Sequence, residues 1–121
     1  MTTTRAESEL RPGDLVLVEF GPVRGTEQDG VRPAIVVSEP EMHGFTRRAI
    51  VCPITRNVSP WPTKVMLPAG LKAEGAILVD QVRSIDREAR ILRRLGAVPA
   101  STLQEVREKL AALLGLDTIE E

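Results

Sequence analysis

The sequence is poor in the residues that cross-link small proteins or hold metal ions. It has one cysteine, one histidine and no tyrosine in 121 residues. A single cysteine excludes an intramolecular disulfide framework, and the apolar run AIVCPIT around Cys52 predicts a buried thiol. One histidine is too few for a zinc site of the usual spacing, so we expect no metal or other cofactor. His43, beside Gly44 in a polar stretch, is predicted to be a surface residue.

Long hydrophobic runs are also absent. No apolar run approaches the roughly 20 residues that cross a bilayer, and the opening MTTTRAESEL lacks the apolar stretch of a signal peptide. We therefore expect a cytoplasmic protein that does not contact membranes. The net charge of −1 provides no general attraction to nucleic acid. Five arginines nevertheless gather between 83 and 94; they form either a solvated strand edge or a basic stripe for a polyanion.

The sequence does contain a series of short β-type runs followed by one helical pattern. Strands are predicted at 15–20, 32–38, 47–55, 64–68 and 75–86, with a possible further strand in EARILRRLGAVP. The stretch EPEMHG between the second and third runs is predicted to be a loop.

The predicted helix lies at the C-terminal end. Ser101 with Gln104, and Thr102 with Glu105, have the spacing of a capping box. Four apolar residues follow on one helix face, and Gly115 is placed to end the helix. The four are Leu103, Val106, Leu110 and Leu113. We predict a flexible tail over 1–11 and a single mainly β domain with a C-terminal helix over 12–121, built as a small barrel or strongly twisted sheet.

Three polar features interrupt the predicted strands. The loop GTEQDGVRP ends in Arg32 and Pro33. The proline holds the backbone of Arg32 extended, and a guanidinium matches a phosphate group in a two-pronged way. Thr55 ends the third apolar run, and Asp80 and Gln81 interrupt the run GAILVDQV. These groups either serve a phosphate site or satisfy one another structurally.

The order of these stretches resembles the MazF/PemK (Kid) family of toxin ribonucleases from type II toxin–antitoxin systems. The resemblance is carried by RPGDLVLVEF, GTEQDGVRPAIVVS, AIVCPIT and ILVDQVRSID, with GAVPASTLQEVREKLAALLGL as the last helix. It implies a homodimeric barrel of the Src-homology-3-like kind. Such a toxin cuts single-stranded RNA, including mRNA, at short sequences without metal, leaving a 2′,3′-cyclic phosphate and a 5′-hydroxyl. It also implies a cognate antitoxin with an acidic, partly disordered C-terminal segment.

The resemblance also implies roles for particular residues. Arg32 and Thr55 match the catalytic arginine and threonine of the family, while Thr26 and Gln81 match positions near bound RNA. Because an arginine side chain is a poor proton shuttle, we assign Arg32 mainly to charge stabilisation. The expected RNA contacts are Thr26, Glu27, Gln28, Trp61, Gln81 and Arg83, and Glu27 is a candidate base.

Two departures from the family pattern bear on specificity. Arg56 and Asn57 stand after Thr55 where a small hydroxyl residue is usual, and aromatic residues for base stacking are sparse. Trp61, between two prolines, either contacts RNA or antitoxin or packs on its own barrel. The alternative function is a CcdB-like toxin that binds gyrase, or a regulator that does not cleave; an arginine–threonine pair at a phosphate site argues against a gyrase binder.

Overall fold

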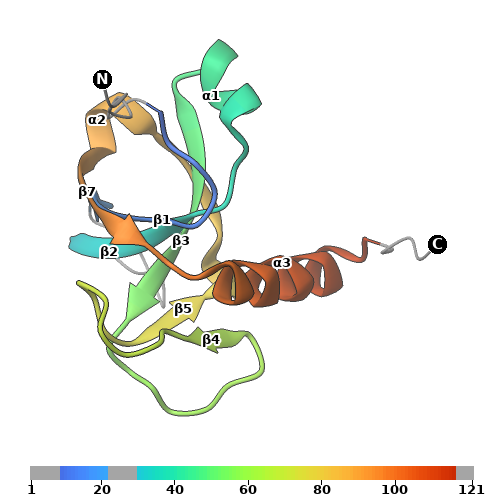
Figure 1. The fold of residues 1–121 in the computed structure, drawn as a ribbon. Coiled ribbons are helices and arrows are strands. Elements are labelled where there is room, and N and C mark those ends of the chain that lie inside the picture. The colour runs from blue at the N-terminus through green and yellow to red at the C-terminus, as the bar shows by residue number, and fades with distance from the viewer. Residues whose placement is uncertain (1–8, 22–29, 117–121) are drawn as a thin grey trace, which may run out of the picture.

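The computed structural model describes residues 9–21 and 30–116. Its elements are short strands joined by turns and small helices, as Figure 1 shows. The strands are β1 (Asp14–Glu19), β2 (Val31–Val36), β3 (Arg48–Thr55), β4 (Lys64–Met66), β5 (Ala76–Leu78), β6 (Arg83–Asp86) and β7 (Ile91–Ala97). The helices are α1 (Pro40–Phe45), the 3₁₀ turn η1 (Val79–Gln81), α2 (Arg87–Arg90) and α3 (Ala100–Leu114).

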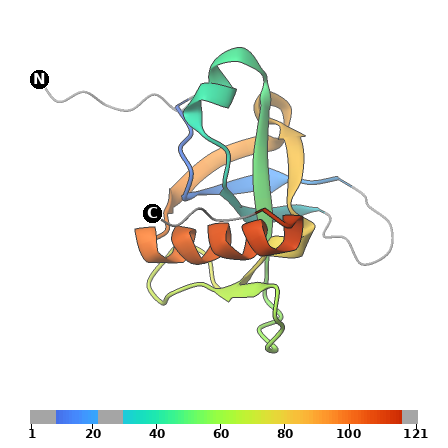
Figure 2. The same ribbon diagram turned by 90° about the vertical axis from the view of Figure 1, so that its right-hand side faces the viewer.

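The strands form one curved sheet of antiparallel pairs. Its order is β4-β5-β3-β2-β1-β7, and β6 pairs with β3 beside this path. The sheet curls into a barrel-like body without closing, and α3 runs across one side of it (Figure 2). The predicted fold class, mainly β with a C-terminal helix, is confirmed, and β7 confirms the possible strand in EARILRRLGAVP.

The predicted long strand over 75–86 is broken in the middle. On β3, two residues separate Val51 from Ile54, whereas five separate their partners Arg83 and Ile77. The three additional residues form η1, in which Asp80 is exposed. The apolar run could not predict this break, because a continuous apolar run does not distinguish a strand from a short buried turn.

Two hydrophobic clusters lie on opposite faces of the paired strands, as alternating side chains require. The first, here the barrel cluster, contains Leu10, Val16, Val18, Phe20, Ala34, Val36, Ala49, Val51 and Ile85. The second, the helix cluster, lies towards α3 and contains Leu15, Ile35, Cys52, Ile54, Val65, Ile77, Val79, Val98 and Val106. Leu10 is 3% exposed, so the predicted tail over 1–11 is wrong at this residue; residues 1–8 lie outside the described part.

Cys52 confirms the predicted buried thiol. It is completely buried in the helix cluster. Burial first, and the negative charge of Asp80 second, raise the pKa of the Cys52 thiol to about 12. The side chain is therefore protonated at neutral pH and serves as a small hydrophobic group rather than a nucleophile.

Helix α3 ends where predicted but begins differently. Gly115 forms its C-cap in the left-handed region, with φ of 69°. The N-cap is Pro99, and no side chain caps the helix, so the predicted capping boxes are wrong. Thr102 is instead buried against the body, 7% exposed. Because this first turn is buried, the hydroxyl of Thr102 does not cap the end of the helix.

The short helices α1 and α2 were not predicted. The stretch EPEMHG, expected to be a loop, contains most of α1, and His43 within it is buried rather than on the surface. Asp86 caps α2 by accepting hydrogen bonds from the backbone N–H groups of Glu88 and Ala89. The Ala89 bond, with help from Arg47, lowers the pKa of Asp86. Helices of four to six residues carry too little periodicity to be detected from sequence.

No helix within the described ranges is both long and apolar enough to cross a membrane.

Candidate active site

Arg32 and Thr55 share one face of the sheet at one end of it. The last paired residues of β2 and β3 are Ala34 and Pro53, and Arg32 and Thr55 each lie two positions further along. Because residues two apart in a strand share a face, Arg32 and Thr55 lie on the face of Ala34, which belongs to the barrel cluster. The two residues predicted to be catalytic therefore come from neighbouring strands to the same side of the same sheet end.

Arg83 adds a second guanidinium to this face. Its Cα partner on β3 is Val51, a residue of the barrel cluster. The guanidinium carbon lies 5.1 Å from the centroid of the Phe20 ring, a distance at which a cation–π attraction operates. Phe20 follows β1 directly, and its backbone N–H donates a hydrogen bond of 2.8 Å to the carbonyl oxygen of Gly30, just before β2. Arg83 is thus held towards the end of the sheet from which Arg32 arises.

Thr55 is held tightly. It is 8% exposed, and its Oγ1 accepts a hydrogen bond of 3.1 Å from the backbone N–H of Asn57. Gly75 packs on its main chain so closely that a Cβ at Gly75 would lie 2.0 Å from the carbonyl oxygen of Thr55. Since Oγ1 already accepts from Asn57, the hydroxyl hydrogen remains available for donation to another oxygen.

The other predicted site residues are distributed around this centre. Gln81 is half-buried in η1, and Trp61 is 64% exposed in the loop that follows β3. Thr26, Glu27 and Gln28 lie outside the described residues. The register therefore places Arg32, Thr55 and Arg83 on one face, while Gln81 lies in η1 between β5 and β6 and Trp61 in the loop between β3 and β4.

Two lysines that the sequence did not single out hold the loop bearing Trp61. Lys64 Nζ donates to the carbonyl oxygens of Asn57 (2.8 Å) and Ser59 (3.0 Å). Lys109 Nζ, from α3, donates to the carbonyl oxygen of Pro62 at 2.8 Å. A pairing between a lysine and a backbone carbonyl leaves no sequence signal, because any residue type supplies the carbonyl.

The arginine-rich segment is more fully neutralised than the sequence indicated. Arg90 pairs with Glu19 at 3.2 Å, and Arg94 pairs at 3.3 Å with Asp14, whose side chain is 3% exposed. Both partners come from β1, distant in sequence. Two of the five arginines of this segment are therefore already paired with acids of the same sheet.

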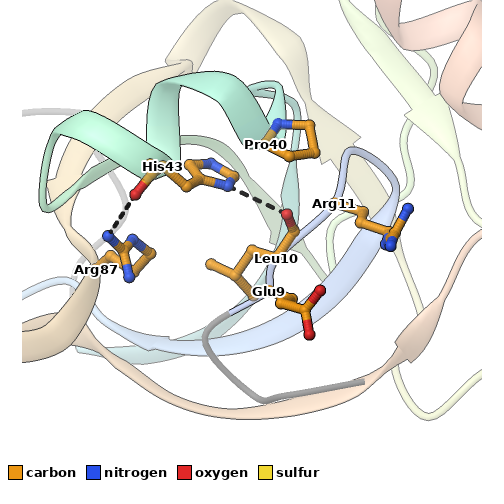
Figure 3. Close-up of a pocket in the computed structure, with 7 residues that line it drawn as sticks. Glu9, Leu10, Arg11, Pro40, His43 and Arg87 are labelled. Carbon is orange, nitrogen blue, oxygen red and sulfur yellow. Dashed lines mark hydrogen bonds between the residues drawn. The ribbon is translucent and has the colours of Figure 1, made fainter. Parts of the chain in front are cut away.

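Arg87 also turns inward, as Figure 3 shows. Its Nη2 donates to the carbonyl oxygens of His43 (3.0 Å) and Thr46 (2.9 Å) and so holds α1. It borders a cavity of about 330 Å³ that is also lined by Leu10 and Pro40. Arg87 therefore holds α1 in place and is not part of an exposed stripe.

His43 also holds α1 in place, because both of its ring nitrogens make hydrogen bonds. Its Nδ1 lies 3.1 Å from the carbonyl oxygen of Leu10, which can only accept, so Nδ1 carries the hydrogen (Figure 3). Nε2 then accepts from the hydroxyl of Ser38 at 2.7 Å, and the Ser38 oxygen accepts from the Ile50 N–H at 2.9 Å. His43 links the start of the chain to α1 and β3.

Within residues 9–21 and 30–116, no three His, Cys, Asp or Glu side chains gather as a set that could hold a metal ion.

The structure is a small barrel-like protein in which the side chains of Arg32 and Thr55 come from the same face at one end of the sheet. The chain belongs to the family of PemK-like, MazF-like toxins of type II toxin–antitoxin systems, whose model matches residues 11–114. This confirms the family predicted from the sequence.

Individual relatives carry names from the same family. The chain is 37% identical over 103 residues to the endoribonuclease toxin MazF of Escherichia coli (strain K12), covering 85% of this chain and 92% of the relative. The crystal structure of MazF from Deinococcus radiodurans matches with a TM-score of 0.81 and 39% identity, covering 88% of this chain and 97% of that one. A MazE–MazF crystal structure from the same organism matches with a TM-score of 0.76 and 36% identity, covering 89% and 97%. The predicted class of enzyme agrees with the names of these relatives.

Proposed function

We propose that this protein is the toxin of a type II toxin–antitoxin system and an endoribonuclease that cuts single-stranded RNA without a metal ion. The class of activity rests on the family, since curated relatives at 30–37% identity are named endoribonucleases. The observation that carries the site is the register of β2 and β3, from which Arg32 and Thr55 reach the same face at the same sheet end.

In the proposed reaction the 2′-hydroxyl oxygen of the RNA attacks the adjacent phosphorus. The bond from phosphorus to the 5′-oxygen breaks, which leaves a 2′,3′-cyclic phosphate and a 5′-hydroxyl. The 2′-hydroxyl gives up its proton to a base, and the leaving 5′-oxygen takes one up. Arg32, always charged, stabilises the added negative charge on the phosphorane. Thr55 donates its free hydroxyl hydrogen to a phosphate oxygen, since Asn57 already occupies an acceptor site.

The proton steps need a group other than Arg32, whose side chain does not deprotonate at neutral pH. Glu27, outside the described residues, is the proposed base. For the remaining RNA contacts we propose Trp61, Gln81 and Arg83, together with Thr26 and Gln28. An exposed indole such as that of Trp61 offers a stacking surface for a base, at about 1–3 kcal/mol per stacked base.

Cleavage should persist in excess EDTA and yield cyclic-phosphate ends. The expectation follows from a mechanism in which a guanidinium and a hydroxyl carry the charge stabilisation. The measurement is incubation of purified protein with mixed-sequence single-stranded RNA plus EDTA, followed by sequencing and end-group analysis of the products. Activity restored only by a divalent ion, or products with 5′-phosphates, would contradict this mechanism.

We further propose that the protein is a homodimer joined through an apolar groove beside the end of α3. The groove has a volume of about 400 Å³ and is lined mainly by apolar residues of the sheet and the helix: Val37, Ile50, Val82, Leu110, Ala111, Leu114 and Leu116, with Arg107. Leu114 is 63% exposed and Leu116 61% exposed. A second copy that covers these leucines would remove a contiguous apolar surface from water.

Leu114→Glu should convert the dimer to a monomer without unfolding it. Burying an unpaired carboxylate in an apolar interface is strongly unfavourable, whereas Leu114 is exposed in the single chain. Light scattering coupled to size-exclusion chromatography reports the mass. Leu92→Glu is the matched control, because Leu92 is 52% exposed on β7. A monomeric wild type, or a Leu114→Glu variant that stays dimeric, would refute this interface.

The proposed restraint is a cognate antitoxin whose acidic, partly disordered C-terminal segment folds along the toxin and competes with RNA. Its support is the exposure of Trp61, a rigid aromatic anchor of the kind that dominates interfaces. Ordering such a segment costs on the order of 2–5 kcal/mol, so a large footprint is needed to offset it.

Antitoxin peptide and RNA should therefore compete, and added salt should weaken both. Trp61 is the only tryptophan, so its fluorescence reports antitoxin binding without interference. The measurement is a titration of labelled RNA at rising peptide concentration, with tryptophan emission recorded in parallel. An RNA affinity unchanged at saturating peptide would exclude a shared groove and leave the ribonuclease proposal standing.

A further inference from the structure

A groove begins immediately beyond Thr55. It has a volume of about 670 Å³ and is lined by Arg56, Val58, Leu71, Lys72, Ala73, Glu74 and Gly75. This size lies within the ~300–1,000 Å³ of typical small-molecule sites. One end adjoins the proposed catalytic residue directly, because Arg56 follows Thr55 in the chain and Gly75 packs on the Thr55 carbonyl. We call it the flanking groove.

The flanking groove contains two of the few described cationic side chains that make no ion pair, hydrogen bond or aromatic contact within the fold. Most described arginines and lysines make an ion pair, a hydrogen bond or an aromatic contact. In the ranges 9–21 and 30–116, the side chains without such a partner belong to Arg11, Arg56, Lys72 and Arg93. Arg56 and Lys72 line this groove together and carry its positive charge.

The rest of the lining suits a nucleobase. Val58 is 49% exposed and Leu71 half-buried, so the groove offers apolar surface to a base plane. Glu74 is exposed and has no hydrogen-bond or ion-pair partner in the described chain. A carboxylate accepts hydrogen bonds from amino and imino groups of a base edge, and it repels phosphate. The two cations and the acid therefore suit different parts of one nucleotide.

We propose that the flanking groove binds the nucleotide adjoining the scissile phosphate, with Arg56 and Lys72 on its phosphate and Glu74 on the donor edge of its base. This inference rests on the proposed ribonuclease function and adds a subsite to it. The loop over 68–75 then shares in selecting the sequence that is cut. Arg56 stands out in the sequence as a departure from the family pattern, whereas Lys72 and Glu74 do not, because nothing in the sequence brings positions 72 and 74 beside position 56.

The test compares three variants on a defined substrate. Wild-type protein first cuts a mixed-sequence single-stranded RNA, and sequencing of the ends defines an oligonucleotide substrate and the base preference around the cut. The variants are the double substitution Arg56→Ala with Lys72→Ala, the single substitution Glu74→Gln, and the control Arg11→Ala. Arg11 is an exposed uncommitted cation near the start of β1, at the opposite end of the sheet from Thr55.

The double variant should raise KM several-fold with little change in kcat. The slope of log kcat/KM against log salt should become shallower by about 0.7 for each lost single-strand phosphate contact. Glu74→Gln should shift the preference at one position next to the cut by about five-fold or more. Arg11→Ala should change neither quantity.

Three results are decisive: the first two overturn the flanking groove alone, and the third also overturns the function on which it rests. A wild type that cuts RNA, with the double variant retaining its KM and salt slope and Glu74→Gln its base preference, overturns the flanking groove alone. An equal rise in KM for Arg11→Ala would attribute the effect to overall charge and also overturn it. A wild type that leaves RNA intact overturns the proposed function and the groove together.

Discussion

Arg32→Ala is expected to cut RNA about 10²–10³ times more slowly than wild type while remaining folded in the proposed dimer. The expected loss follows from the proposed role of Arg32 as a charged donor to the phosphorane. Arg32 is half-buried in β2, and the following Pro33 keeps its backbone extended, so the guanidinium is directed by the strand. Folding should survive because the residue sits at the end of the paired region of β2 and β3, outside both clusters.

The measurement is a single-turnover cleavage rate, with circular dichroism and light scattering to verify the fold. Arg32→Lys is a useful second variant, because it keeps the charge and loses the planar two-pronged donor. Its cleavage rate should fall between those of wild type and Arg32→Ala. A clean preparation of Arg32→Ala that cuts as fast as wild type would remove Arg32 from the mechanism.

Gly75→Ala is expected to destabilise the protein strongly and to reduce cleavage by the protein that remains folded. Gly75 has φ of +132° and contacts the main chain of β3, so a methyl group there would meet the Thr55 carbonyl at 2.0 Å. Backbone offers no flexible end that could move aside, so β3 or the loop must shift. The displaced residue would be Thr55, the proposed hydrogen-bond donor.

Gly70→Ala provides the matched control. Gly70 lies in the same loop with φ of +92°, but a Cβ there meets no atom within 4 Å. It therefore introduces only the backbone strain of about 1–3 kcal/mol. Gly75→Ala should lose about 1–3 kcal/mol more in the free energy of unfolding, as overpacked sites do. Urea denaturation followed by circular dichroism measures the difference; equal stabilities would show that the close packing at Thr55 is not maintained in solution.

The sequence was sufficient to predict the elements whose own residues show a local pattern. The apolar runs around Leu15, Ile35 and Cys52 predicted β1, β2 and β3, and Gly115 marked the end of α3. Arg32 and Thr55 could be singled out because each is a polar group at the end of an apolar run. Their position on one face follows from the β2–β3 register, which the sequence alone does not determine.

What could not be predicted depends on contacts between distant residues. His43 reads as a surface residue, because its burial depends on the Leu10 carbonyl and Ser38, neither of which marks it in sequence. The neutralisation of Arg94 depends on Asp14, 80 positions earlier (94 minus 14) and across a β1–β7 pairing with register shifts. Local propensity and charge counts contain no information about such partners.

The hydrogen bonds from two lysines to the loop over 56–63 affect the free energy with which a ligand binds there. Lys64 and Lys109 occupy three of its carbonyl oxygens, so the segment bearing Trp61 has its shape before any ligand arrives. Immobilising a flexible side chain at an interface costs about 0.5–1.5 kcal/mol, and a loop ordered during folding avoids much of that loss on association. An RNA or peptide that meets Trp61 would therefore dock on a preorganised surface, and its affinity would depend on fit rather than on inducing order in the toxin.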